Sequence, residues 1–274
     1  MKNNQKFPIR LIIWSKDRAC QLSLLLKSID KFAPDIFDIK ILYKYSSDFF
    51  KIGYEKLIKD IPNITCTKEI DGQFQNWTYS QITTASHLVS FATDDSVIYR
   101  QLEKKLLEKI LPEQECYVTS LRGGYNTIVQ DVHQNTTQPP LNVVVDSGDW
   151  LEWPIVCYHP HENYGYPFSL DFHIFRRSLM LRLLEDMTFN NSSELEGKLT
   201  AFRQEIDYMK SPSQSVAVNI PINTAGGVTV AGKYHPISLE ELNQKWLDGF
   251  EIDLDHIAAQ DIVGAHQEIQ LQWK

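Results

Sequence analysis

The sequence predicts an α/β fold in which a mixed, mainly parallel sheet is flanked by helices. Two observations lead to this prediction. Short apolar segments alternate with segments of helical periodicity through residues 9–121. The first apolar segment, Ile9–Trp14, is apolar apart from Arg10, as expected for a strand covered on both faces. Because strands joined by helices lie parallel, with the helices on the faces of the sheet, this alternation indicates a layered α/β domain.

Each predicted element of the first half has its own signal. Apolar residues recur at helical spacing between Leu22 and Ile29 and again between Tyr54 and Ile61, and a proline follows each segment. The predicted strands cover residues 9–14, 39–45, 64–67, 87–93 and 116–121, and the predicted helices cover 22–29, 54–61, 77–86 and 99–111.

The regular alternation ends at about residue 122. Residues 122–140 are polar and are expected to form a loop. Further strands are predicted over residues 143–145, 172–175 and 216–220, and further helices over 178–187, 193–209 and from the capping box Ser238–Glu241 onward. We therefore expect one domain with two halves, a regular α/β half over residues 1–121 and a less regular half over residues 122–274.

The composition limits the classes of function. The chain has 274 residues, of which 43% are hydrophobic, enough for a large core. Its formal net charge of −8 argues against a nucleic-acid-binding protein, which needs a basic face. No apolar segment is long enough to span a membrane, and the four cysteines lack C-x-x-C spacing. These features predict a reduced, cytoplasmic protein without a transmembrane segment, and peripheral membrane association stays open.

Two adjacent carboxylates, Asp94 and Asp95, follow a predicted buried strand. Two like charges at such a position are costly unless a cation or hydrogen-bond donors compensate them. Hard oxygen ligands at a rigid strand end suit Mg²⁺ or Mn²⁺, and a metal held there could carry a diphosphate. The alternative is an acidic, solvated turn after the strand.

A second polar group, Ser15–Arg18, follows the first strand where a helix begins. Ligands of open α/β sheets bind at the carboxyl ends of the strands, so we expect this group at the same edge as Asp94 and Asp95. Backbone N–H groups and Arg18 could hold the phosphates of a nucleotide. The chain has neither a G-x-G-x-x-G nor a Walker A motif. The alternative is a helix cap with a surface arginine.

The segment from Trp150 to Phe168 is dense in aromatic residues. Sugar rings stack on exposed aromatic side chains, so this segment is a candidate sugar-binding site. The alternative is a second hydrophobic cluster beneath a long loop.

Asp171 is the candidate general base. Its neighbours Leu170 and Phe172 are apolar, which favours a raised pKa if the carboxyl is buried. A helix cap or an ion pair with a nearby arginine is the alternative. His173 lies on the same face if the segment is extended and could complete a metal site, although a core histidine is commoner. Glu196 is the reserve base.

These features together resemble glycosyltransferases of the GT-A fold, most closely the bacterial family 2 type. Ile12–Arg18 and the helix after it look like the first strand and helix of that family. Thr93–Ser96 looks like its D-x-D region, but Ser96 stands at the last position if Asp94 is the first. The segments 120–122, 164–176 and 215–221 resemble blocks of unassigned role in uncharacterised bacterial members.

The resemblance implies transfer of a sugar from a nucleotide-diphosphate sugar to a saccharide, glycoconjugate or other hydroxyl acceptor, with inversion, in polysaccharide biosynthesis. It implies Mn²⁺ or Mg²⁺ at Asp95, with His173 as a further ligand. Residues 1–121 would bind the donor, and residues 122–274 would bind the acceptor and supply Asp171 as the base. The donor-binding candidates are Ser15, Lys16, Arg18, Tyr45, Asp94 and Arg122. The acceptor-binding candidates are Trp150, Trp153, Tyr164 and Tyr166.

Two other functions stay open on the sequence. A nucleotidyltransferase acting on a sugar phosphate could use the same acids and metal, but it should have a first loop rich in Gly and Lys. Ser15–Arg18 has one lysine and no glycine. A non-catalytic carbohydrate-binding domain would keep the aromatic segment and bind sugar without a metal.

Overall fold

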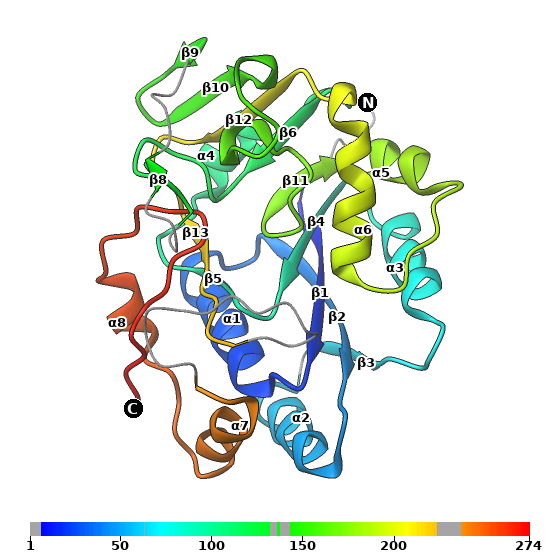
Figure 1. Cartoon of the computed structure of the whole chain (residues 1–274), viewed down its shortest axis with the longest axis vertical. Helices are drawn as coiled ribbons and strands as arrows, with labels where there is room; N and C mark the ends of the chain where they lie inside the picture. The colour runs from blue at the N-terminus through cyan, green and yellow to red at the C-terminus, as the bar shows by residue number, and fades with distance from the viewer. Residues whose placement is uncertain (1–6, 63, 132–135, 138–142, 224–236) are drawn as a thin grey trace.

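The computed structural model describes residues 7–62, 64–131, 136–137, 143–223 and 237–274. Its centre is a nine-stranded sheet with the strand order β3-β2-β1-β4-β11-β6-β12-β10-β9 (Figure 1). Strands β11 and β10 run opposite to the other seven strands of this sheet. The sheet is therefore mixed and mainly parallel, and the predicted α/β class is confirmed.

The strands of the large sheet are β1 (Ile9–Lys16), β2 (Phe37–Lys44), β3 (Thr65–Lys68), β4 (Leu88–Thr93), β6 (Tyr117–Ser120), β9 (Val145–Asp146), β10 (Trp150–Pro154), β11 (His173–Arg176) and β12 (Tyr208–Pro212). Two small sheets pair β5 (Ser96–Ile98) with β13 (Ala217–Asn219) and β7 (Val129–Asp131) with β8 (Thr136–Thr137). The α-helices are α1 (Ala19–Phe32), α2 (Asp48–Asp60), α3 (Phe74–Thr83), α4 (Lys104–Ile110), α5 (Arg177–Leu184), α6 (Ser192–Leu199), α7 (Leu239–Leu247) and α8 (Leu254–Ala258). Short 3₁₀ helices cover Ile155–Cys157, Asn163–Gly165 and Thr200–Glu205.

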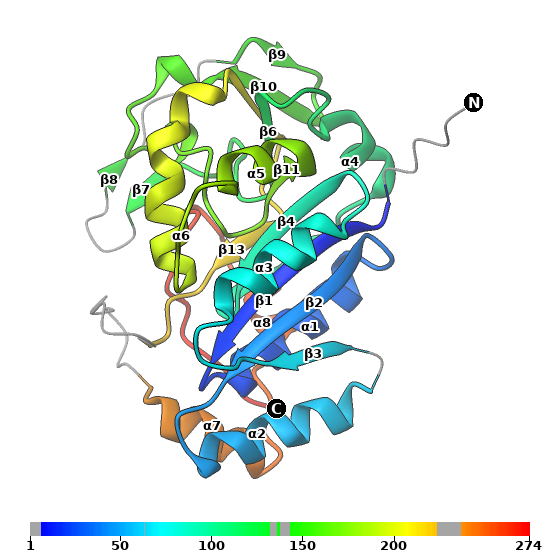
Figure 2. The same ribbon diagram turned by 90° about the vertical axis from the view of Figure 1, so that its right-hand side faces the viewer.

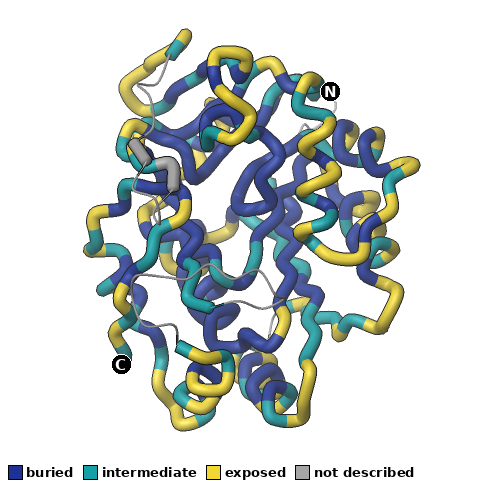
Figure 3. The backbone as a smooth tube through the Cα atoms, in the orientation of Figure 1, coloured by how far each residue is buried: buried dark blue, intermediate teal, exposed yellow. Residues whose placement is uncertain are grey.

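Strand β1 explains why the sheet is covered on both faces. Successive side chains of a strand point to opposite faces. Ile9, Leu11 and Ile13 pack in the cluster that includes α1, whereas Ile12 and Trp14 pack in the cluster that includes α3, α5 and α6. Figure 2 shows α3, α5 and α6 on one side of the sheet and α1 on the other. The central strands are therefore buried, and exposed backbone is concentrated at the periphery (Figure 3).

The less regular half differs from the prediction in three places. Residues 122–140, which were expected to form a loop, contain the paired strands β7 and β8. The helix predicted over residues 193–209 ends early, because Ser192–Leu199 is followed by a 3₁₀ turn and then by β12, which pairs with β6 and β10. Residues Trp150–Pro154 form strand β10 rather than loop. Leu151 and Trp153 are buried, and the other three residues of the strand are half-buried. This alternation with a period of two was the available signal for a strand.

Candidate active site

A cleft of about 700 Å³ lies at the carboxyl ends of β1, β2 and β4. Its volume falls within the roughly 300–1,000 Å³ usual for sites that bind small molecules. Its lining includes Trp14, Lys16, Arg18, Asp94, Asp95 and Asn219, together with residues 190–193 at the start of α6. The two polar groups predicted to share one edge of the sheet, Ser15–Arg18 and the acid pair, are therefore brought together.

The turn after β1 directs Arg18 toward the acid pair. Asp17 adopts a left-handed backbone conformation with φ of 59°, which Asp tolerates better than most residues. Its carboxylate accepts a hydrogen bond from the backbone N–H of Ser46 at 2.7 Å, which anchors the turn to the end of β2. Helix α1 starts directly after Arg18, whose side chain is only 9% exposed.

Arg18 bridges the two carboxylates at the end of β4. Its Nη1 lies 3.0 Å from Asp94 Oδ1 and 3.1 Å from Asp95 Oδ2. Burial raises the pKa of Asp94 to about 6, and the charge of Arg18 opposes that rise. The acid pair is thus compensated by an arginine from the turn after the neighbouring strand β1, and it is not the simple solvated turn.

Asn219 is a site residue that the sequence did not single out. It lies at the end of β13, and its Nδ2 donates to Asp95 Oδ1 at 2.8 Å. The hydroxyl of Thr93 lies 2.7 Å from the same oxygen. Asn219 belongs to the segment 215–221, which had a resemblance but no assigned role. Strand β13, which carries Asn219, pairs with β5 next to the acid pair. This pairing could not be predicted from the residues around Asn219 in the sequence.

Asp171 does not have the raised pKa that we expected. The hydroxyls of Thr93 and Ser96 lie 2.7 and 3.1 Å from its Oδ1, and Arg122 Nη1 lies 3.4 Å from its Oδ2. Burial alone would raise the pKa of Asp171, but Arg122, His266 and these hydroxyls together hold it below its ordinary value. The expectation was wrong because the apolar neighbours in the sequence do not surround the carboxyl, which sits in an ion pair.

Glu196 is a second carboxyl near the cleft, besides Asp94, whose pKa is raised. It lies in α6, three and four residues beyond Ser193 and Ser192, which line the cleft. Residues at this spacing share one face of a helix, so Glu196 lies on the side of the cleft. Burial, helped by the negative charge of Asp171, raises the pKa of Glu196 to about 7.

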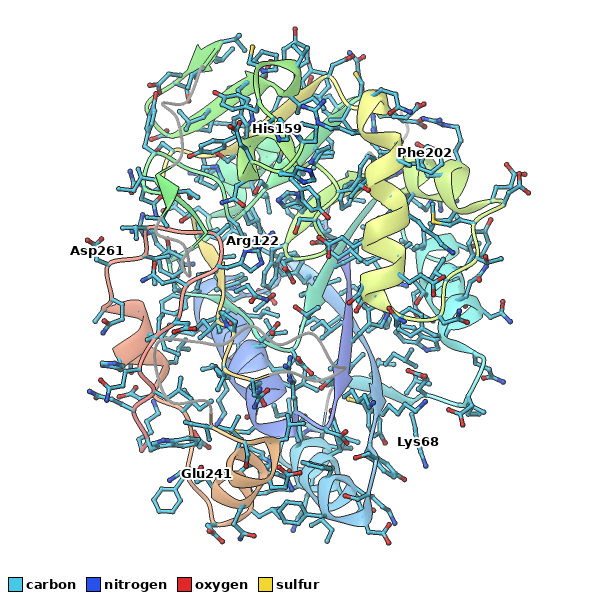
Figure 4. The ribbon with its side chains drawn as sticks, viewed as in Figure 1. Lys68, Arg122, His159, Phe202, Glu241 and Asp261 are labelled. Atoms are coloured by element: carbon cyan, nitrogen blue, oxygen red, sulfur yellow. The ribbon has the colours of Figure 1, made fainter. Side chains whose placement is uncertain are left out.

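Several predicted site residues lie outside the cleft. Arg122 is near the middle of the molecule (Figure 4), where it contacts Asp171 and lines a separate cavity of about 20 Å³. That volume suits about one water molecule rather than a nucleotide. Tyr45 is not among the described residues that line the cleft, and its hydroxyl accepts a hydrogen bond from Lys68 at 2.6 Å.

His173 is separated from Asp95. It lines the small cavity rather than the cleft, and its Nδ1 lies 2.9 Å from the carbonyl oxygen of Pro167. Burial lowers the pKa of His173 to about 3. In the described ranges no group of three or more His, Cys, Asp or Glu side chains could hold a metal ion. His173 is therefore a buried core histidine whose Nδ1 faces a backbone carbonyl, and it lines a different cavity from Asp95.

The aromatic segment is mainly core. Trp153 and Tyr164 are 0% and 3% exposed, and Trp153 Nε1 donates to the carbonyl oxygen of Tyr164 at 2.9 Å. Trp150 and Tyr166 are half-buried and keep some accessible surface.

The expectation of an exposed aromatic belt was wrong for Trp153 and Tyr164. Trp153 lies in β10 and points into the core of the sheet. Tyr164 packs edge-on against Trp153, and its hydroxyl donates to the backbone carbonyls of Gly124 and Thr127.

The acid pair nevertheless suits a divalent cation that arrives with a substrate. Asp94 and Asp95 offer hard carboxylate oxygens at a rigid strand end beside the cleft. Mg²⁺ in phosphate-binding sites is typically held by only one or two carboxylates, and the substrate phosphates complete its shell. A larger ligand set is not needed for that type of site.

Comparison with known proteins shows a limited likeness. No family model matches the chain. The bifunctional glycosyltransferase pgtA of Dictyostelium discoideum is 33% identical over 105 residues, which are 35% of this chain and 14% of that protein. Part of this chain resembles a glycosyltransferase. The resemblance predicted from the sequence is thereby confirmed, and the chain spans only a small part of that relative's length.

Solved structures give a likeness of overall fold. TarS of S. aureus in complex with UDP-GlcNAc is 13% identical, with 77% of this chain and 57% of that chain covered and a TM-score of 0.46. The mannosyltransferase PcManGT of Pyrobaculum calidifontis, in complex with GDP-Man and Mn²⁺, is 12% identical, with 80% and 58% covered and a TM-score of 0.46. A cytidylyltransferase of Leptospira borgpetersenii is 8% identical, with 73% of each chain covered and a TM-score of 0.40.

No helix within the described ranges is both long and apolar enough to cross a membrane.

Proposed function

We propose that this protein is a glycosyltransferase that moves a sugar from a nucleotide-diphosphate sugar to a hydroxyl of a saccharide or glycoconjugate. The observation that carries the proposal is the cleft at the strand ends, which has the acid pair Asp94 and Asp95 in its wall and Glu196 one helical turn from its lining. A cation-binding pair and a separate carboxyl with a pKa near 7 are the two parts that such a transfer needs.

The donor would occupy the cleft between β1, β2 and α3. Trp14, Leu42 and Phe74 give the cleft an apolar wall that suits a nucleoside, and Lys16 and Lys44 add positive charge for its diphosphate. Asp95, with Asp94 behind it, would hold Mn²⁺ or Mg²⁺. The bound cation supplies charge neutralisation for the diphosphate leaving group.

The acceptor would approach from the side of α6, near Tyr166, which interacts with Glu196. Trp150 packs in the cluster that includes α1, on the other face of the sheet from α6, so the acceptor role predicted for it is not part of this proposal. The hydroxyl oxygen of the acceptor attacks the anomeric carbon, and the bond between that carbon and the diphosphate oxygen breaks. Glu196 takes the proton of the attacking hydroxyl, and the nucleoside diphosphate leaves with the bonding electron pair. Direct displacement of this kind inverts the anomeric centre.

In this proposal Asp171 acts through its charge on neighbouring residues and is not the base. Its carboxylate adds to the raised pKa of Glu196 and neutralises Arg122. Although Asp171 was the base expected from the sequence, a carboxylate whose pKa is held low is a poor proton acceptor near neutral pH. A role in polysaccharide biosynthesis and a cytoplasmic location are part of the proposal, and the four free cysteines support the latter.

A thermal-shift screen with UDP, GDP, CMP and their sugar conjugates, with and without Mn²⁺, tests the proposal. A ligand that binds only the folded state stabilises it by about 2.7 kcal/mol at 100 times its Kd. We expect one nucleotide family to raise Tm, and to do so more strongly with Mn²⁺. If no nucleotide raises Tm under either condition, the cleft is not a donor site.

A further inference from the structure

The carboxylate oxygens of the acid pair are already committed to partners. Arg18 Nη1 lies 3.0 Å from Asp94 Oδ1 and 3.1 Å from Asp95 Oδ2. The other oxygen of Asp94 accepts the backbone N–H of Lys16 at 3.2 Å. The other oxygen of Asp95 faces the hydroxyl of Thr93 and the side-chain amide of Asn219 at 2.7 and 2.8 Å. A cation that binds both aspartates must therefore share or take the two oxygens that Arg18 holds.

Sharing is unfavourable for electrostatic reasons. A guanidinium carries a full positive charge and does not lose its proton in proteins. A divalent cation on the same oxygens would lie within a few ångströms of that charge, in a site where Arg18 and Asp94 are 9% and 5% exposed. At that separation the repulsion is poorly screened by solvent.

The remaining contacts of Arg18 do not use all of its donors. Its Nη2 donates to the backbone carbonyl of Asn223. Its Nε is buried and has no hydrogen-bond partner in the described part of the chain. A guanidinium has five donor hydrogens, so this arrangement satisfies it incompletely. A phosphate group, which guanidinium binds in a bidentate manner, would satisfy it better.

We propose that Arg18 and the divalent cation compete for Asp94 and Asp95, so that Arg18 keeps the cation from binding until a nucleotide diphosphate arrives. This inference rests on the proposed function, and it describes how cation binding at the same site is regulated. The diphosphate brings ligands for the cation and a partner for the displaced guanidinium. Cation and nucleotide then bind cooperatively, and each raises the affinity for the other by the same factor.

Titration with Mn²⁺ alone, followed by electron paramagnetic resonance, tests the competition without any transfer reaction. We expect Arg18→Gln to bind Mn²⁺ roughly tenfold or more tightly than the wild type, because the competing charge is gone. Lys16→Gln is the matched control, since it removes the same charge from an exposed residue of the same cleft. It should change the Mn²⁺ affinity by less than about threefold, the effect of a solvated charge.

Arg18→Met is a second variant for the case that Arg18→Gln does not fold. Its side chain keeps much of the volume of arginine and carries no charge, so Mn²⁺ should bind this variant more tightly than the wild type. An unchanged or weaker Mn²⁺ affinity in the folded Arg18 variants overturns the competition, as does an equal gain in Lys16→Gln. If the wild type still binds UDP or GDP with Mn²⁺ in that case, the proposed function stands. If neither wild type nor variants bind Mn²⁺ or any nucleotide, both fail.

Discussion

Glu196→Gln is expected to lower kcat by about 10²–10⁴-fold while donor affinity stays near that of the wild type. The substitution keeps the shape of the side chain and removes its ability to accept a proton. The position of Glu196 beside the cleft, one turn from Ser192 and Ser193, makes it the carboxyl best placed to serve an acceptor hydroxyl.

The pH dependence of the wild type follows from the same residue. The pKa of Glu196 is raised to about 7, first by burial and then by the charge of Asp171. A general base works when deprotonated, so kcat should rise with pH through about 7 and then level off. Asp171→Asn removes a neighbouring negative charge and should move this rise to lower pH. The rise of kcat with pH should be absent in Glu196→Gln if Glu196 is the general base.

Glu194→Gln is the matched control for these measurements. Glu194 lies two residues earlier in the same helix, where it pairs with Lys198 at 2.7 Å and is a third exposed. Its loss should leave the rate and the pH profile close to those of the wild type. If Glu196→Gln transfers sugar at the wild-type rate, Glu196 is not the general base, and Asp171 is the next candidate for that role.

Asp95→Asn is expected to lower the affinity for Mn²⁺ in the presence of nucleotide by roughly 100-fold, because it replaces a charged oxygen ligand by a neutral amide. The fold should persist, since an asparagine oxygen can still accept from Thr93 and Asn219. Isothermal calorimetry with UDP or GDP and Mn²⁺ measures the change, and circular dichroism checks the fold.

Asp71→Asn is a suitable control for the acid pair. Asp71 is 90% exposed and pairs with Lys44, which lines the cleft, so the variant changes the same net charge near the site without touching the pair. Equal losses of affinity in Asp71→Asn and Asp95→Asn would mean that general electrostatics, rather than metal ligation, governs nucleotide binding.

The sequence was informative where local pattern and topology agree. The alternation of β1, α1, β2 and α2 predicted a sheet covered on both faces, and the rule that ligands bind at strand ends placed Arg18 beside Asp94 and Asp95. These inferences needed only the order of elements and the direction of the strands.

The site contacts of residues 122–274 could not be predicted, because they join residues that are far apart in the sequence. Asn219 reaches Asp95 through the pairing of β13 with β5, which are separated by more than a hundred residues. Arg122 contacts Asp171 although the two are far apart in the sequence, so the low pKa of Asp171 could not be predicted from its neighbours Leu170 and Phe172. Burial of Trp153 likewise depends on the partner strand β12.

The products formed from a nucleotide sugar test the central claim most directly. Phosphorus NMR can follow the protein with Mn²⁺, the nucleotide sugar selected by the thermal-shift screen and a saccharide acceptor. The account predicts release of nucleoside diphosphate, because the bond between the anomeric carbon and the diphosphate breaks. Glu196→Gln should slow that release. Nucleoside triphosphate and sugar phosphate formed only after pyrophosphate is added would instead identify a nucleotidyltransferase and contradict the account, as would an unchanged nucleotide sugar under all conditions.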